Sequence, residues 1–134
     1  IKDSDKTEEI VGYLISRCGI DEYPNVYIAG DVNALEIALK SYPQIPRCCL
    51  AGGIKDPEVL VDNAIRYKCV RLQFWSTTYT KAAVQRALEA GLLPNLFYAD
   101  DLESAQQAVD YGIVGLLTND IGFIKRNLKL EERA

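Results

Sequence analysis

Residues 94–120 decide the fold of this chain, and they read P-N-L-F-Y-A-D-D-L-E-S-A-Q-Q-A-V-D-Y-G-I-V-G-L-L-T-N-D. Residues 96–99 are a short, mostly apolar run with aromatic side chains, which is typical of a buried strand. Asp100 and Glu103 stand three positions apart, as in a capping box, so we expect Asp100 to be the N-cap of a helix. The apolar stripe of that helix recurs at helical spacing and consists of Leu102, Ala105, Ala108 and Val109.

The same stretch continues with a helix end and a second strand. We expect the helix to end at Gly112, because glycine readily takes the left-handed conformation found after a helix. Residues 114–118 form the second strand, which is followed by polar Asn119 and Asp120. A strand, a helix and a strand thus follow one another within about 25 residues. Such units bury a parallel sheet under helices and place their chemistry at the carboxyl ends of the strands.

The rest of the chain repeats this pattern. Further strands are expected at residues 26–29, 47–51 and 69–75, and further helices at residues 7–18, 33–41, 57–67, 78–90 and 122–130. The tail, residues 131–134, is expected to fray. The strands begin about 18 to 26 residues apart, which fits either an open doubly wound sheet or an arc of a (β/α)8 barrel. No loop carries a G-x-G-x-x-G or G-x-x-x-x-G-K-[ST] motif, so no nucleotide site is indicated.

The composition limits the classes of function. With 134 residues and 49% hydrophobic residues, the chain is one domain or part of one. A formal net charge of -4 argues against a nucleic-acid-binding protein, which needs a basic face. No apolar run is long enough to span a bilayer, so no transmembrane segment is expected.

The cysteines and two missing residue types narrow the chemistry. The cysteines form no C-x-x-C pair and no histidine is present to complete a zinc site, so we expect buried free thiols at Cys18, Cys48, Cys49 and Cys69. The absence of methionine indicates that this sequence is not an unprocessed translation product. The absence of histidine removes the commonest acid–base residue. Either the chain performs no acid–base chemistry, or the part that performs it lies outside these residues.

The segment N-L-F-Y-A-D-D-L-E-S-A-Q-Q-A-V-D-Y-G-I-V-G-L-L-T-N-D resembles the closing segment of the glycerophosphodiester phosphodiesterases. That family ends on a strand with an aromatic residue, usually Trp, then a helix with a D-x-E-like start and a G-V-D-G-I-I-T-D strand. Phe97 stands where the family usually has Trp. The other matching positions are Gly112, Gly115 and Thr118. Two positions depart from the family pattern, because Val114 replaces the usual Asp and Asn119 replaces an acidic residue.

The order of units upstream fits the same family. Its third barrel strand carries E-x-K, and Ile1 and Lys2 followed by a helix are similar to the tail of that strand. The match is less close in residues 26–75, where the family commonly has S-F near the end of the fourth strand and this chain has Ala29-Gly30-Asp31. The resemblance implies an α/β fold, a partial (β/α)8 TIM-type barrel from the end of strand three to strand eight. Residues 1–134 would be its carboxyl-terminal part.

The resemblance also implies a reaction, the hydrolysis of glycerophosphodiesters to glycerol 3-phosphate and an alcohol. In the family a divalent metal, Mg²⁺ or Ca²⁺, is held by carboxylates from strands two and three, and two histidines supply the acid and the base. None of those carboxylates or histidines lies in this chain, so no metal ligand is expected within it. Lys2 matches a family position where a cation lies near the phosphate or the metal, although a surface lysine is an equal alternative.

Further candidates come from the strand ends. Phe97 and Trp75 lie at or near the carboxyl ends of strands, where a substrate wall would be, although core packing is the ordinary role of such residues. Asp31, Asp100 and Asp120 also follow strands, and for Asp100 a helix cap is the favoured role.

Three functions remain open from the sequence. The first is the carboxyl-terminal portion of a phosphodiesterase barrel, which would be inactive as this chain alone. The second is a non-catalytic half-barrel that dimerises or binds a partner. An arc leaves two strand edges and an inner face uncovered, so self-association as a homodimer is expected of it. The third is an open doubly wound phosphate-binding module, which would require a reversal of strand order.

Overall fold

A computed structural model describes residues 1–130 of the chain. Residues 131–134, which we expected to fray, lie outside the described residues. The strands are β1 (Ile28–Gly30), β2 (Arg47–Leu50), β3 (Arg71–Trp75), β4 (Leu93–Phe97) and β5 (Gly115–Leu117). The helices are α1 (Thr7–Cys18), α2 (Val32–Ser41), α3 (Pro57–Arg66), α4 (Lys81–Glu89), α5 (Leu102–Tyr111) and α6 (Ile121–Asn127). Short 3₁₀ turns, η1 (Ser4–Lys6) and η2 (Ile20–Glu22), flank α1.

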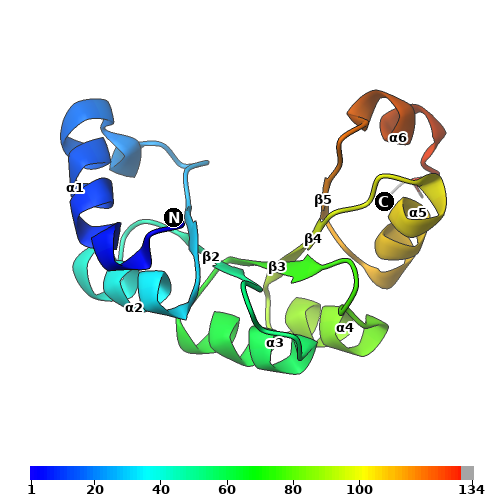
Figure 1. Ribbon diagram of the computed structural model, residues 1–134, viewed down its shortest axis with the longest axis horizontal. Helices are drawn as coiled ribbons and strands as arrows, with labels where there is room; N and C mark the ends of the chain where they lie inside the picture. Colours follow the sequence, from blue (N-terminus) through cyan, green and yellow to red (C-terminus); the bar gives the residue numbers. More distant parts are fainter. Residues whose placement is uncertain (131–134) are drawn as a thin grey trace.

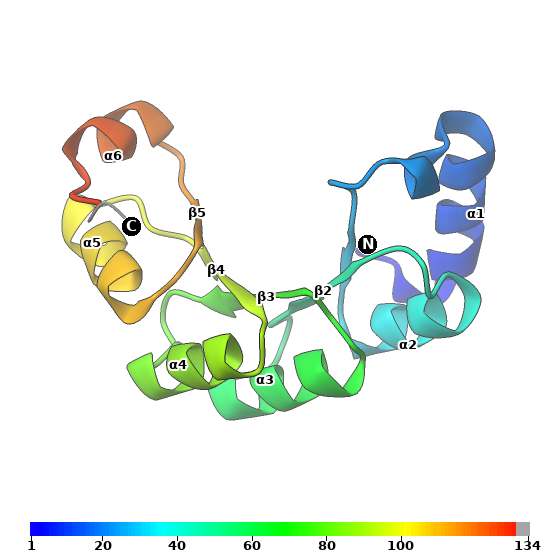
Figure 2. The same ribbon diagram turned by 180° about the vertical axis from the view of Figure 1, so that it is seen from behind.

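The strands form one five-stranded parallel sheet in the order β1-β2-β3-β4-β5. Each strand therefore lies beside the next one in the sequence, with a helix in every connection. Figures 1 and 2 show the result from two sides, an arc with its helices along the convex side. This sequential order confirms the predicted partial barrel and excludes the doubly wound sheet, which would reverse its strand order.

The convex side of the sheet holds the main hydrophobic core. Leu72, Phe74 and Leu96 alternate along β3 and β4 and are almost fully buried under α3 and α4. Their partners from the helices include Val61 and Val84, which are also inaccessible to solvent. A smaller cluster joins α1 and α2 to β1. Because the helices bury only one face of the sheet, the other face is left without a covering layer in the described residues.

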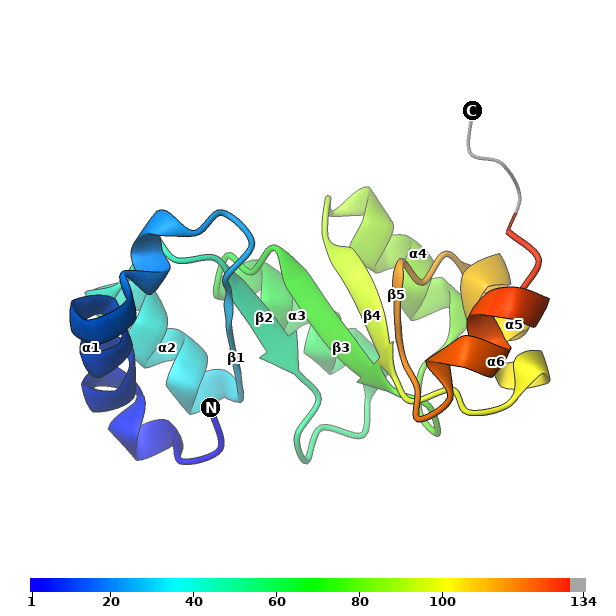
Figure 3. The ribbon, with the colours of Figure 1, turned by 90° about the horizontal axis from the view of Figure 1, so that it is seen from above.

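We call that other face the inner face. Its residues follow from the strand registers and from the alternation of side chains along each strand. They are Ala29, Cys48, Leu50, Arg71, Gln73, Trp75, Leu93, Asn95, Phe97, Gly115 and Leu117. Figure 3 looks onto this face, with β1 to β5 in order, α3 and α4 behind the strands, and α1 and α6 at the two sides.

The expected elements are present, and several boundaries differ. α1 matches the predicted residues, and Gly19 after it is left-handed with φ 57°. β1 begins two residues later than expected, at Ile28, since only residues 28–30 pair with β2. β4 begins earlier, at Leu93, because the chain pairs with β3 from that residue onward. Pro94 is compatible with this strand because its carbonyl still accepts from Val114 N at 2.9 Å.

Side-chain caps mark the starts of α2, α3, α4 and α6. Asp31, Asp56, Thr80 and Asp120 each accept a hydrogen bond from the backbone N–H of a residue two or three positions on. Asp56 is followed by Pro57 at the first position of α3, where proline is favoured. Thr80 moves the start of α4 from the expected residue 78 to Lys81.

Arg47 ties the amino ends of two neighbouring strands together. This first residue of β2 is only 5% exposed, and no carboxylate among the described residues accepts from it. Its Nε donates to the carbonyl of Tyr67 at 3.0 Å, and Nη2 donates to that of Lys68 at 3.0 Å. Its Nη1 donates to the carbonyls of Ile45 at 2.8 Å and Pro43 at 3.2 Å. The guanidinium therefore satisfies carbonyls of the loops that lead into β2 and β3.

We predict that Arg47→Ala lowers the free energy of unfolding by about 3 kcal/mol, since several carbonyls lose their donor together. Urea denaturation followed by circular dichroism measures this. Arg17→Ala is the matched control, because Arg17 is exposed on α1 and should change stability little. Equal denaturation midpoints for the two variants would contradict the role given to Arg47.

Candidate functional site

The carboxyl ends of the five strands form one rim of the sheet, and two predicted site residues meet there. Trp75 and Phe97 end β3 and β4 and are register partners. Their ring centroids lie 5.0 Å apart with an interplanar angle of 78°, an edge-to-face contact. Both side chains extend from the inner face, and Trp75 is 37% exposed. The sequence therefore placed these two residues correctly at the strand ends; their contact with a substrate stays a prediction.

Tyr98 extends this pair into a cluster. Its ring lies 5.4 Å from that of Phe97 at 80°, and it is 45% exposed. Trp75 is held from the other side, because its Nε1 donates to the carbonyl of Gly52 at 3.2 Å. We call Trp75, Phe97 and Tyr98 the aromatic cluster. It presents a partly exposed apolar wall at the rim, suited to pack against carbon atoms of a small molecule.

Asp100 joins the ends of β4 and β5. Its carboxylate accepts from the backbone N–H of Asn119 at 2.7 Å and from the Asn119 side-chain amide at 2.7 Å. Thr118 Oγ1 donates to it at 3.1 Å. The backbone N–H of Asn119, followed by its amide and the Thr118 hydroxyl, holds the pKa of Asp100 below its usual value. We call these three residues the rim brace, because they fix the two loops that carry the rim.

The prediction that Asp100 caps α5 is wrong. The N-cap is Asp101, whose carboxylate accepts from Ser104 N at 2.8 Å and from Ser104 Oγ at 2.7 Å. The backbone N–H of Ser104, then its hydroxyl, lowers the pKa of Asp101. The reason is geometric, because the carboxylate of Asp100 is turned across the rim toward Asn119 and cannot also reach the first turn. The expected capping box with Glu103 is replaced by this Asp101–Ser104 pair.

The other acidic residues at the rim act as caps. Asp31 accepts from Ala34 N at 3.0 Å, and Asp120 accepts from Phe123 N at 2.9 Å. Within residues 1–130 no group of three or more Cys, Asp or Glu side chains is arranged to hold a metal ion. The donor set at the rim therefore does not fit a divalent cation, which prefers several carboxylate oxygens.

Lys2 lies at the β1 edge of the sheet, on the far side of β1 and β2 from the aromatic cluster. The amino group of Ile1 donates to the carbonyl of Ala29, so the start of the chain runs beside β1. Lys2 is exposed, and β1 and β2 lie between it and Trp75. The part of the sheet described here thus does not bring Lys2 to the aromatic cluster. Its proximity to a phosphate or metal stays a prediction.

The cysteines are free, and three of them are buried: Cys48, Cys49 and Cys69. Burial raises the pKa of Cys48 and Cys49 to about 12 and that of Cys69 to about 11, which disfavours the thiolate. The prediction that Cys18 is buried is wrong, because it ends α1 on the solvent side. No helix in residues 1–130 has the length and apolar character needed to cross a bilayer.

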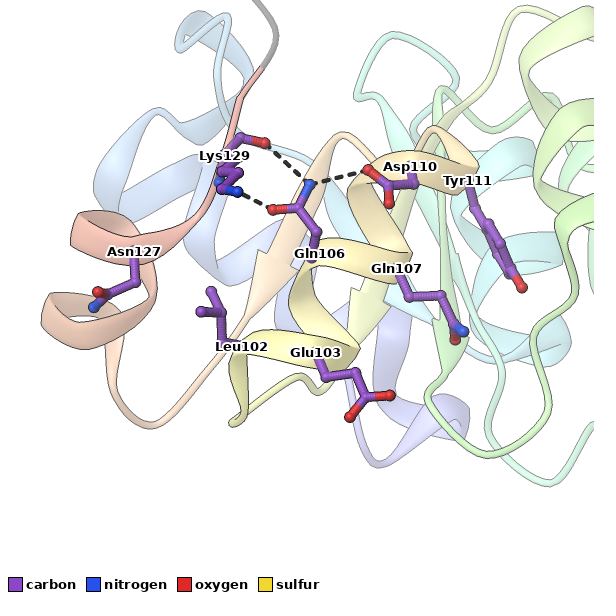
Figure 4. Close-up of a pocket in the computed structure, with 8 residues that line it drawn as sticks. All are labelled: Leu102, Glu103, Gln106, Gln107, Asp110, Tyr111, Asn127 and Lys129. Carbon is purple, nitrogen blue, oxygen red and sulfur yellow. Dashed lines mark hydrogen bonds between the residues drawn. The ribbon is translucent and has the colours of Figure 1, made fainter.

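Two cavities lie beside α5, and one of them reaches Thr118 of the rim brace. One of about 730 Å³ is lined by α5, Asn127 and Lys129, as Figure 4 shows. In it, Gln106 Nε2 donates to Asp110 at 2.9 Å and to the carbonyl of Lys129 at 3.0 Å, while Lys129 N donates to Gln106 Oε1 at 3.0 Å. The side-chain amide of Gln106 is thus fully engaged by groups of the cavity wall.

Sequence reasoning missed two contributors to the rim, Tyr98 and Asn119. Tyr98 directly follows Phe97, and a second aromatic residue at a strand end was the available signal. For Asn119 the signal was the pair Asp100-Asp101, since a helix needs only one N-cap and the second carboxylate is left for another partner.

We predict that the rim brace makes stability depend on pH. The pKa of Asp100 is lower in the folded chain than in the unfolded chain. The carboxylate therefore stabilises the fold fully above the pKa of the unfolded chain, about 4, and this stabilisation is lost as the pH falls through the pKa of the folded chain. The difference in unfolding free energy between wild type and Asp100→Asn should be largest near pH 7 and vanish toward pH 2. Urea denaturation across that range measures it. Asp21→Asn is the control, and a pH-independent difference for Asp100→Asn would contradict the brace.

Comparisons with known proteins address the fold. No family model matches the sequence, and no curated protein matches it. Among solved structures, an Oleispira antarctica phosphodiesterase in complex with the product sn-glycerol-3-phosphate superposes with a TM-score of 0.73 at 15% identity. That match covers 91% of this chain and 50% of the phosphodiesterase.

Two further structures give the same result. A glycerophosphodiester phosphodiesterase from Parabacteroides distasonis has a TM-score of 0.70 at 14% identity, over 92% of this chain and 50% of its own. A Silicibacter pomeroyi protein assigned as a glycerophosphoryl diester phosphodiesterase has a TM-score of 0.75 at 16% identity, over 92% of this chain and 43% of its own. The chain spans about half the length of these structures. It has the fold of part of a phosphodiesterase barrel, as the sequence resemblance implied.

Proposed function

We propose that residues 1–134 are the carboxyl-terminal part of a barrel that hydrolyses glycerophosphodiesters to glycerol 3-phosphate and an alcohol. The observation that carries this proposal is the rim, where Trp75 and Phe97 meet at the carboxyl ends of neighbouring parallel strands. Active sites of (β/α)8 barrels lie at this end of the strands. The fold of the solved phosphodiesterases, one of them with sn-glycerol-3-phosphate bound, supports the assignment.

The residues of this chain would bind and position the substrate. The aromatic cluster would pack against the carbon atoms of the glycerol or the alcohol. The rim brace would hold the loop after β4 and the loop after β5 together beside the aromatic cluster. Asp100 in the first loop accepts hydrogen bonds from Thr118 and Asn119 in the second. Lys2 would place a positive charge near the phosphate once the barrel is closed. These roles require no proton transfer by this chain, which has no histidine.

The acid, the base and the metal site would come from outside these residues. A divalent cation, Mg²⁺ or Ca²⁺, offsets negative charge on phosphoryl oxygens when it is bound. Because the rim carboxylates of residues 1–130 are engaged as caps and in the rim brace, they are not suited to hold it. The small-molecule partner is thus a glycerophosphodiester of the complete barrel, and its alcohol stays open.

A non-catalytic half-barrel that dimerises or binds a partner is the second candidate. The uncovered inner face favours it, since bare sheet faces tend to find a covering partner. The two candidates differ in what lies on the rest of the polypeptide, because the enzyme requires histidines and metal-binding carboxylates there.

We predict that the 134-residue chain alone does not hydrolyse glycerophosphocholine. A missing acid–base group typically costs a factor of about 100 to 10,000, and the metal site would be missing as well. The measurement is release of glycerol 3-phosphate with Mg²⁺ or Ca²⁺, and with a chelator as control. The longer polypeptide that supplies the remaining strands should be active and should lose activity with the chelator. Metal-dependent turnover by the short chain, checked by intact mass, would contradict the assignment of the chemistry.

We predict that Phe97→Ala in the active longer polypeptide raises KM or lowers kcat/KM about tenfold, because the wall against the substrate carbons is lost. Steady-state kinetics and thermal unfolding separate this effect from misfolding. Tyr13→Ala is the matched control, since Tyr13 is 59% exposed in the middle of α1. An unchanged kcat/KM with unchanged folding would leave Phe97 as a packing residue.

A further inference from the structure

The inner face carries one charged side chain, Arg71. It lies near the amino end of β3, and its guanidinium is placed over the ring of Tyr27, 5.6 Å from the centroid. The neighbouring inner-face residue across the sheet, Cys48, is 1% exposed, so the arginine stands in a largely apolar setting. This location is the end of the sheet opposite the rim, away from the proposed chemistry.

No carboxylate of the described residues balances this charge. The ion pairs found in residues 1–130 join Lys6 with Asp3 and Arg86 with Glu58 and Asp62, all outside the inner face. The inward positions of the five strands include no Asp or Glu. An arginine enclosed without an acidic partner is costly, so a layer that covers this face must supply one.

A second polar group on the same face also lacks its partner. Asn95 of β4 is 6% exposed, and its Oδ1 is buried without a donor in residues 1–130. Gly115 of β5 is its register partner, and a methyl group at that position would collide with Oδ1. Glycine at residue 115 therefore keeps room for the amide, whose Oδ1 is already inaccessible to solvent in residues 1–130.

We propose that the inner face is closed by the remaining strands of the same polypeptide, and that an inward-facing Asp or Glu on those strands pairs with Arg71. The inference rests on the proposed function, which places residues 1–134 in a longer barrel. The structures that share this fold have about half of their chain outside the match. A barrel of eight strands leaves about three to be supplied beyond the five described here.

A second copy of this chain fits the face poorly. Two copies would bring two Arg71 guanidinium groups into one interior with no inward carboxylate from either chain. Like charges in a low-dielectric interior repel strongly. Two five-stranded arcs would also supply more strands than a barrel of eight holds. Charge and strand count thus both favour a covering segment of different sequence over the homodimer expected from the open edges.

Denaturation of the longer polypeptide tests the ion pair. Arg71→Leu and Arg71→Glu should each lower the folding equilibrium constant by roughly a hundredfold, because the opposing carboxylate loses its partner. Arg17→Glu is the matched control, since Arg17 lies 5.9 Å over the ring of Tyr13 on exposed α1. In the Arg71→Glu background, each inward-facing Asp or Glu of the closing strands is then replaced by Lys, one at a time. The replacement at the position that pairs with residue 71 should restore stability. Failure of every replacement, or an effect no larger than that of Arg17→Glu, would overturn the proposal.

Light scattering of the 134-residue chain tests whether a second copy of the chain covers the inner face. This test can be made even if the variants of the longer polypeptide do not fold. Gln73→Lys adds a charge next to Arg71 on the inner face, and Gln44→Lys adds one at an exposed loop. The proposal expects no dimer that is sensitive to Gln73→Lys. A dimer dissociated by Gln73→Lys and not by Gln44→Lys would overturn it. Neither result depends on turnover, so a longer polypeptide without phosphodiesterase activity would refute the proposed function and leave this test intact.

Discussion

The pairing of β3 with β4 determines the rest of the structure. Its register joins five residue pairs, from Arg71 with Leu93 at one end to Trp75 with Phe97 at the other. Because side chains alternate along a strand, this one register sends Phe74 to the helices and Gln73 to the inner face. A slip of one residue would exchange the two faces. The core, the rim and the unpaired polar groups therefore depend on the same set of backbone hydrogen bonds.

The two ends of the sheet have different tasks. At the amino ends, Arg47 donates to backbone carbonyls of the loops around it and holds these loops together. At the carboxyl ends, the aromatic cluster is partly exposed and the loops are fixed by Asp100. Barrels generally divide stability and activity between these two ends in this way. The division is what makes the rim, and not the grooves beside α5, the place to search for substrate.

The strands and most helices could be predicted, because they depend on local patterns. The spacing of the apolar runs left two strand orders open, and the family resemblance favoured the sequential one that the sheet has. Gly112 marked the end of α5 and has a left-handed φ of 102°. Asp100 could not be assigned from its neighbours, since Asp100 and Asp101 both fit the local cap pattern. Asn119, in the loop after β5, decides which of the two caps the helix, because its N–H donates to Asp100 and leaves Asp101 as the cap. The sequence R-L-Q-F-W separates Arg71 and Gln73 from Leu72 and Phe74, yet which of the two faces the helices cover is a tertiary fact.

The uneven exposure of the thiols offers a way to follow the opening of the sheet. Cys18 is accessible at the end of α1, while Cys48 and Cys49 lie inside β2. A thiol reagent should therefore modify the folded chain at Cys18 first and reach the strand cysteines only when β2 separates from its neighbours. Mass spectrometry of the labelled peptides would then give two rates, one for modification of Cys18 and one for modification of Cys48 and Cys49. The slower reaction reports how often this arc opens, and any layer that closes the inner face should slow it further.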